Sequence, residues 1–153
     1  MKALDNIDHK ILELLQQDGR MTVKELSKQL NLSTTPVFER IKKLERAGII
    51  DHYAAVLNTD KLGIKLKAFA HISLKDHSKE LVENFVRCII EFPEVMECHY
   101  VTGDSDFIIV ILVEDMEKYK EFVMEKLFDV PNIGKLESYF SLSVRKKTNQ
   151  ISL

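Results

Sequence analysis

Residues 22–46, TVKELSKQLNLSTTPVFERIKKLER, constrain the fold most, because they predict two short helices joined by a tight turn. Thr22 and Glu25 form a capping-box pattern, in which each side chain accepts a hydrogen bond from a backbone N–H at the start of a helix. Asn31 tolerates the left-handed conformation that ends a helix, and Ser33 is a favoured cap for the next one. Two helices around such a turn make a helix-turn-helix unit, whose second helix enters the DNA major groove.

The second helix of this unit has an apolar stripe and a polar outer face. Val37, Ile41 and Leu44 recur at helical spacing and face the core. Residues 20–46 carry seven basic and three acidic side chains, a net charge of +4, whereas the whole chain has a formal charge of −2. A positive segment in a mildly acidic chain is typical of nucleic-acid binding, although the face of a solvated αα-hairpin can look the same. The positions facing away from the stripe are Thr34, Thr35, Glu39, Arg40, Lys42, Lys43 and Arg46.

We expect different roles for these outward positions. Thr34, Thr35, Glu39 and Arg40 lie near the helix start and are expected to approach base edges. A second group of basic side chains is expected to meet phosphate, since lysine is more often a positioning charge than a base reader. That group is Lys42, Lys43, Arg46 and, in the connection before the unit, Arg20.

A further helix precedes the helix-turn-helix unit. Asp5 can cap it, an apolar face recurs from Ile7 to Leu15, and Gly19 ends it. Residues 1–48 are therefore expected to form a three-helix, winged-helix-like DNA-binding domain. Residues 49–57 are expected to be extended, and the turn-rich segment NTDKLG at 58–63 completes a linker over residues 49–63.

Residues 64–153 are expected to form a second domain of different architecture. Alternating residues predict strands over 66–74, 95–102, 107–113 and 133–145. Helices are expected between the first and second strands, starting at Asp76 or Ser78, and between the third and fourth, starting at Asp115. The order β-α-β-β-α-β is the ferredoxin-like arrangement, so the chain is predicted to be an α+β protein.

The ferredoxin-like domain is expected to mediate assembly. Both of its helices lie on one face of the sheet, and the opposite apolar face needs a cover. A second copy of the sheet is an economical cover and would produce a two-fold dimer. A dimer also presents two recognition helices to two DNA half-sites.

Three stretches carry a family resemblance, and together they extend over essentially the whole chain. They are LDNIDHKILELLQQDGR, ELSKQLNLSTTPVFERIKKLERAGII and ECHYVTGDSDFIIVILV. In order and spacing they closely resemble the Lrp/AsnC (feast/famine) family of transcriptional regulators. The resemblance implies sequence-specific DNA binding, with assembly or DNA affinity responding to a small molecule, commonly an amino acid. It also implies homodimers that assemble into octamers or other higher oligomers.

The chain departs from the family pattern at one point. Many members have Ser-Pro-Thr-Pro where this chain has Ser33-Thr34-Thr35-Pro36. The change relaxes the helix start and adds a hydroxyl that could meet phosphate. Which bases are read stays open, because Val37 and Phe38 also lie near the helix start.

The resemblance places an effector site near the turn at residues 103–106. The candidate residues are Thr102, Gly103, Asp104 and Asp106. Two carboxylates and exposed turn N–H groups could hold the ammonium and carboxylate ends of an amino acid. An ordinary hairpin turn is the alternative, since Gly and Asp dominate turns.

Other classes of function receive less support from the residues. Strand alternation points Cys98 and His99 to opposite faces, so they cannot chelate a metal together. No nucleophile–base set, P-loop or dinucleotide motif indicates an enzyme, and the apolar run Phe107–Val113 lacks the exposed aromatics of an RNA-recognition strand. A metabolite-binding module without DNA activity remains an alternative, although the positive segment argues against it. We expect no cofactor besides an amino-acid effector.

Composition predicts a cytoplasmic protein. Two cysteines make no disulfide framework, and no apolar run approaches the roughly 20 residues that span a bilayer. The N-terminus lacks the basic-then-apolar pattern of a signal segment, so we expect none.

Overall fold

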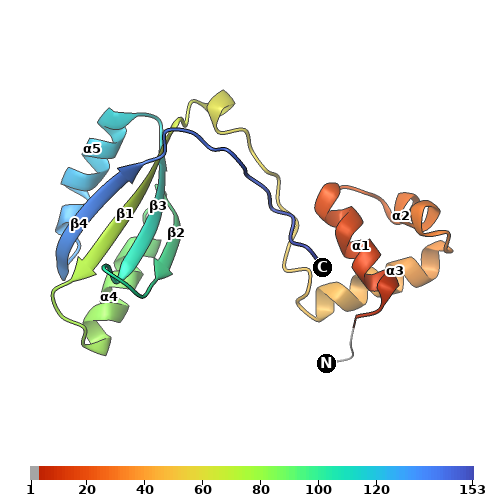
Figure 1. Cartoon of the computed structure of the whole chain (residues 1–153). Coiled ribbons are helices and arrows are strands. Elements are labelled where there is room, and N and C mark those ends of the chain that lie inside the picture. Colours follow the sequence, from red (N-terminus) through yellow and green to blue (C-terminus); the bar gives the residue numbers. More distant parts are fainter. Residues whose placement is uncertain (1–3) are drawn as a thin grey trace. The chain divides into compact units, whose positions relative to one another are not determined.

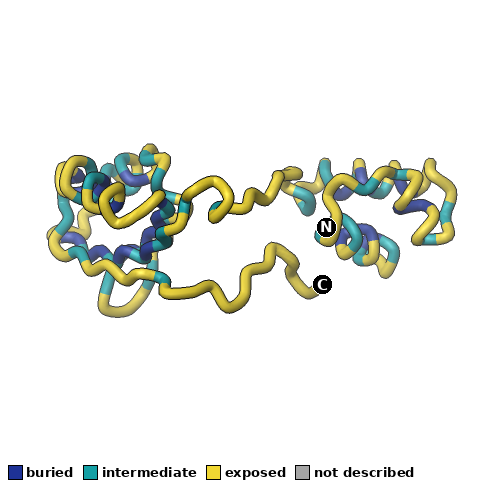
Figure 2. The backbone as a smooth tube through the Cα atoms, turned by 90° about the horizontal axis from the view of Figure 1, so that it is seen from above, coloured by how far each residue is buried: buried dark blue, intermediate teal, exposed yellow. Residues whose placement is uncertain are grey.

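The computed structural model describes residues 4–153. The chain divides into two compact units, the first comprising residues to Val56 together with Lys146–Leu153, and the second comprising Leu57–Arg145. The last eight residues thus pack with the N-terminal helices, whereas the predicted second domain included them. Figure 2 shows buried backbone inside each unit and exposed backbone over residues 51–58 and 142–153.

The first unit is built on three helices, α1 (Asn6–Gln17), α2 (Val23–Leu30) and α3 (Thr34–Arg46) (Figure 1). The predicted capping box at the start of α2 is present, with the Glu25 N–H donating to Thr22 Oγ1 and the Thr22 N–H donating to Glu25 Oε2. Asn31 is left-handed at φ 53°, as expected of a helix end. Ser33 caps α3 by position, but its side chain makes no capping hydrogen bond. The buried apolar residues are Ile11, Leu12, Leu26, Val37, Ile41 and Leu44.

The segment after α3 was predicted to be an extended linker, and residues 51–58 belong to no helix or strand. Gly48 adopts φ +67° and ends α3, but residues 51–58 have no strand partner. Within residues 4–56 the unit contains helices and no strand.

The second unit has the predicted β-α-β-β-α-β order (Figure 1). Its elements are β1 (Leu66–Leu74), α4 (Lys79–Ile90), β2 (Val95–Tyr100), β3 (Phe107–Val113), α5 (Met116–Glu125) and β4 (Ile133–Phe140), with short 3-10 turns η1 (Asp60–Leu62) and η2 (Leu127–Asp129). The sheet order is β2-β3-β1-β4, and all neighbouring strands are antiparallel. The α+β class and the ferredoxin-like arrangement are confirmed.

The core of this unit lies between the sheet and its two helices. Ala68, Ala70 and Ile72 of β1 are completely buried and belong to one cluster with Phe85 of α4 and Phe122 of α5. The alternation that predicted β1 thus places one of its faces in the core. Three apolar residues of these helices, Leu81, Ile90 and Met116, lie outside this core and are exposed.

The last strand is shorter than predicted. β4 ends at Phe140 rather than at residue 145, and Leu142 is 99% exposed. The Ser141 N–H donates to Lys67 O at 2.9 Å, near the start of β1 at Leu66. Beyond that point β1 offers no further backbone to pair with, so the alternating pattern continues without a partner strand. β2 likewise ends at Tyr100, two residues earlier than expected.

Within residues 4–153, no helix is long and apolar enough to span a membrane.

Candidate functional site

The outer face of α3 is the candidate DNA-binding surface. Val37, Ile41 and Leu44 anchor the helix in the core, which turns the opposite side outward. The sequence did not decide whether Val37 or Phe38 could face DNA. In the structure Val37 is completely buried, whereas Phe38 is 44% exposed. The exposed residues on the outer face are Thr34, Thr35, Phe38, Glu39, Lys42 and Arg46.

The two basic residues at the end of this face are held by local contacts. Lys42 Nζ lies 2.7 Å from Glu45 Oε2 and 5.8 Å from the centre of the Phe38 ring. Arg46 Nε donates to Lys42 O at 3.1 Å. Both side chains stay at the surface, where cations near a helix C-terminus are favoured by the helix dipole.

Arg40 was expected to lie free on the outer face of α3, but it is paired with two carboxylates. Its Nη1 atom is 2.6 Å from Asp8 Oδ1 and 2.7 Å from Asp5 Oδ2, so that the side chain ties α3 to the start of α1. Lys43 Nζ is 3.2 Å from Asp8 Oδ2. The reason is the complete burial of Asp8, because a buried carboxylate needs ionic or hydrogen-bonding partners.

Asp8 also forms the capping box of α1. Its N–H donates to Asp5 Oδ1 at 2.9 Å, and the Asp5 N–H donates to Asp8 Oδ2 at 3.4 Å. Burial raises the pKa of Asp8, but the hydrogen bonds from Arg40 and Lys43 lower it more, and the net pKa is below its ordinary value of 3.8. The D-x-x-D spacing could have suggested the capping box; nothing local indicated that Arg40, 32 residues later, would bind it.

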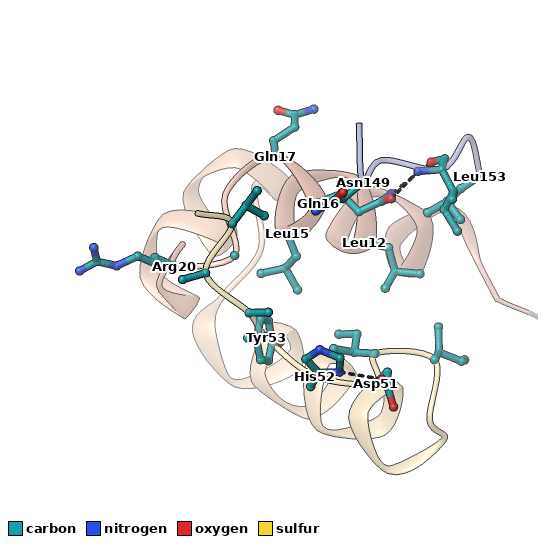
Figure 3. A pocket seen from close by; sticks show the side chains of 17 residues that line it. Leu12, Leu15, Gln16, Gln17, Arg20, Asp51, His52, Tyr53, Asn149 and Leu153 are labelled. Atoms are coloured by element: carbon teal, nitrogen blue, oxygen red, sulfur yellow. Dashed lines mark hydrogen bonds and ion pairs between the residues drawn. The ribbon is translucent and has the colours of Figure 1, made fainter. Parts of the chain in front are cut away.

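Arg20 lies beside a hollow of about 760 Å³ in the first unit, lined by α1, residues 49–56 and the C-terminal segment. Figure 3 shows the Arg20 side chain pointing away from the other labelled residues. Its backbone N–H donates to Asp18 Oδ1, which fixes the connection between α1 and α2, and its guanidinium group is left at the surface.

The side chains of Gln16 and Gln150 join the C-terminal segment to α1, and Gln150 Nε2 donates to Gln16 O at 3.5 Å. Gln16 Nε2 donates to Ile151 O at 3.2 Å, and the Ile151 N–H donates to Gln16 Oε1 at 2.7 Å. The amide thus pairs with the backbone as a neighbouring strand would. Nothing in the sequence predicted this contact.

The turn at residues 103–106 has two aspartates in different situations. Asp106 Oδ2 accepts from the Leu74 N–H at 2.8 Å, and Asp106 Oδ1 lies 2.9 Å from His77 Nε2. The Leu74 N–H bond is the main cause that holds the pKa of Asp106 below its ordinary value. This carboxylate thus binds the end of β1 and His77, a residue that was not among the predicted site residues.

The rest of the turn is open to solvent. Thr102, Gly103 and Asp104 are exposed, and Gly103 has φ +131°, which favours glycine. The Asp104 carbonyl accepts from Ser73 Oγ at 3.4 Å, while its carboxylate has no hydrogen-bond partner within residues 4–153. Of the two carboxylates expected to meet an effector, only that of Asp104 is therefore free.

Cys98 and His99 lie on opposite faces of β2, as predicted. Cys98 packs against the core, where burial raises the pKa of its thiol, and His99 is exposed with its Nε2 atom 2.8 Å from Glu97 Oε2. Throughout the described part of the chain, no three His, Cys, Asp or Glu side chains gather to hold a metal ion.

A helix-turn-helix unit followed by a ferredoxin-like domain defines a DNA-binding regulator with a separate sensory domain. Residues 4–51 match the family model described as "Winged helix-turn-helix DNA-binding", and residues 67–151 match the "Lrp/AsnC ligand binding domain". The chain belongs to the Lrp/AsnC family of transcriptional regulators, which are not enzymes.

Similar proteins cover almost the whole chain. It is 37% identical over 150 residues to the Leucine-responsive regulatory proteins of Escherichia coli K12 and Salmonella typhimurium, covering 98% of this chain and 92% of theirs. A transcriptional regulator from Neisseria meningitidis, solved as a complex with L-Met, matches with a TM-score of 0.93 and 35% identity, covering 98% of this chain and 97% of that one. An AsnC family regulator from Agrobacterium tumefaciens also has a TM-score of 0.93, with 34% identity and 97% coverage of both chains.

Proposed function

We propose that this regulator reads double-stranded DNA with α3 and that an amino acid, bound near the turn at residues 103–106, alters its DNA affinity or assembly. The observation that carries the first part is the exposed polar face of α3, held outward by a buried apolar stripe. The second part is supported by the L-Met complex of the Neisseria meningitidis regulator, which is similar over 98% of this chain. We place the protein in the cytoplasm with its DNA target.

The DNA contacts divide by residue type. Thr34, Thr35 and Glu39 approach base edges, since their side chains are exposed on the first two turns of α3. Arg40 instead fixes α3 against α1 through Asp5 and Asp8. The residues that meet phosphate are Lys42, Lys43, Arg46 and Arg20.

The effector contacts are assigned from the different surroundings of Asp104, which is exposed, and Asp106, which is hydrogen-bonded within the chain. The exposed carboxylate of Asp104 takes the ammonium group of the amino acid, and the backbone around Thr102 and Gly103 takes its carboxylate group. Asp106 holds the turn through Leu74 and His77. The ligand thus meets a turn whose position is fixed by β1.

Assembly uses the sheet face that α4 and α5 do not cover. Tyr139 of β4, which is 53% exposed, pairs across the sheet with Phe69 of β1, and its ring centre lies 4.8 Å from that of His71. A second copy of this face would cover these rings in a homodimer, which can assemble further into octamers or other higher oligomers. Tyr139→Asp is expected to reduce the size seen by gel filtration, whereas Met124→Asp, at an exposed residue of α5, leaves it unchanged.

The effector proposal is tested by thermal unfolding of the full-length protein with each of the twenty amino acids. A ligand that binds only the folded state raises the melting temperature by mass action. For the amino acid that does so, Asp104→Ala is expected to abolish the shift. Asp106→Ala serves as the matched comparison, because it should lower the starting melting temperature by releasing the Leu74 N–H and His77.

Three results would contradict these assignments. If no amino acid shifts the melting temperature, the effector is not an amino acid. If a ligand is found and Asp104→Ala responds as the parent does, the turn does not hold its ammonium group. If DNA binding, measured by fluorescence anisotropy, does not depend on α3 side chains, the DNA-reading role of this helix is wrong.

A further inference from the structure

Phe38 is an exposed aromatic residue on the face of α3 that is turned outward. It is 44% exposed and does not belong to the apolar cluster of the first unit. Its neighbours on the same two helical turns, Thr34, Thr35 and Glu39, are polar and exposed. An isolated apolar residue at a surface is ordinary, but here it lies on the surface that meets DNA.

The same two turns lack the side chains that usually read bases by paired hydrogen bonds. Guanine is read by Arg or Lys and adenine by Asn or Gln, and residues 34–39 contain none of these. Arg40, next along the helix, is held by Asp5 and Asp8 at 2.7 and 2.6 Å. Reading by this part of the helix therefore has to rely on hydroxyl groups, one carboxylate and apolar contact.

The major groove offers one apolar group, the 5-methyl of thymine, and phenylalanine is among the side chains that contact it. The Phe38 ring is also steadied by Lys42, whose Nζ atom lies 5.8 Å from the ring centre, a cation–π distance. An ordered ring loses little side-chain freedom when it packs against a base edge.

We propose that Phe38 packs against the 5-methyl group of a thymine and so selects thymine at one position of each half-site. This inference rests on the proposed entry of α3 into the major groove. Within that function, it assigns to Phe38 an apolar contact that the carboxylate of Glu39 beside it cannot make.

The test uses duplexes selected by the full-length protein from a random-sequence library. In the selected duplex each thymine is replaced in turn by deoxyuridine, which lacks only the 5-methyl group. Removing the contacted methyl is expected to weaken binding about fourfold, the equivalent of one buried methyl-sized group. Phe38→Ala is expected to weaken binding to the unmodified duplex and to show no further loss at that thymine.

Matched variants separate this contact from other effects. Tyr53→Ala removes another exposed aromatic of the same unit, 49% exposed and outside α3, and should keep the full deoxyuridine penalty. Phe38→Ala should melt within a few degrees of the parent protein, since the ring is not part of the core.

A deoxyuridine penalty that is absent in the parent, or equal in the parent and Phe38→Ala, overturns the inference while leaving DNA binding by α3 intact. If Lys42→Ala and Arg46→Ala leave affinity for the selected duplex unchanged, α3 is not the reading helix, and both the proposed function and this inference fail.

Discussion

At the scale of single residues, the buried carboxylate of Asp8 decides how α3 is held. Arg40 and Lys43 are its cationic partners, and removing one partner of a buried charge leaves it uncompensated. Arg40→Ala is therefore expected to lower the free energy of unfolding by about 2 kcal/mol. Urea denaturation followed by circular dichroism measures this change.

Arg46→Ala is the matched control for that substitution. Arg46 is on the same helix but exposed, and its contact is to a backbone carbonyl of the preceding turn, so its loss should change stability by less than about 0.5 kcal/mol. Equal losses in the two variants would mean that Arg40 does not carry the α1–α3 connection. Arg40 would then again be a candidate for contact with base edges.

At the scale of elements, the parts that could be predicted are those set by neighbouring residues. The capping box of Thr22 and Glu25, the left-handed Asn31 and the alternation of β1 are all local signals, and all are present in the structure. The end of β4 could not be predicted, because it depends on where β1 begins rather than on residues 141–145. The ion pairs of Arg40 could not be predicted for the same reason, since its carboxylate partners lie 32 and 35 residues away.

The site shows the same division between local and distant causes. Helical spacing correctly separated the apolar stripe of α3 from its outer positions. The sequence also indicated the turn at residues 103–106, but it could not distinguish Asp104 from Asp106. That distinction depends on the Leu74 N–H and His77, which come from a distant part of the sequence.

The attachment of the C-terminal segment to α1 can be tested through Gln16. Gln16 makes two hydrogen bonds to the backbone of Ile151, so Gln16→Ala should expose the Ile151 amide to solvent. Its hydrogen exchange is expected to quicken roughly fivefold, as for the loss of one hydrogen bond of about 1 kcal/mol. Gln17→Ala is the control, since its side chain points away from the segment (Figure 3). Equal exchange in the two variants would show that the segment is not held by Gln16.

At the scale of the whole molecule, several carboxylates make stability depend on pH. Hydrogen bonds hold the pKa values of Asp5, Glu25 and Asp106 below their ordinary values, and Asp8 is lowered by its cationic partners despite burial. The unfolded chain therefore binds more protons than the folded chain at acidic pH, so stability should fall as pH drops. The decline should begin near the ordinary values of 4.5 for Glu and 3.8 for Asp and continue below them.

Urea denaturation between pH 7 and pH 3 measures this dependence. Asp8→Asn should be less stable at pH 7 and should lose less stability on acidification, because its amide has no proton to gain. Glu80→Gln is a control at an exposed position of α4 and should follow the parent curve. A parent stability that rises on acidification would contradict the assigned directions.

The distribution of charge between the units predicts how salt affects DNA binding. Residues 1–56 with 146–153 carry eleven basic and eight acidic side chains, a net charge of +3, whereas residues 57–145 carry eleven basic and sixteen acidic ones, a net charge of −5. Although the whole protein has a formal charge of −2, the unit that meets DNA is therefore positive. The logarithm of the binding constant should fall linearly with the logarithm of the salt concentration. Each phosphate contact adds about 0.9 to the steepness of that slope.

Single substitutions then count these contacts. Lys42→Ala and Arg46→Ala should each make the slope shallower by about 1, and Arg46→Ala should weaken binding to all duplexes alike, because phosphate contacts carry no sequence information. Lys120→Ala removes the same charge from an exposed position of α5 in the second unit and should leave the slope unchanged. If the three variants change the slope equally, the salt dependence of DNA binding is determined by the net charge of the molecule and not by the face of α3. If only the α3 variants change it, the positive charge acts where the helix meets the phosphates.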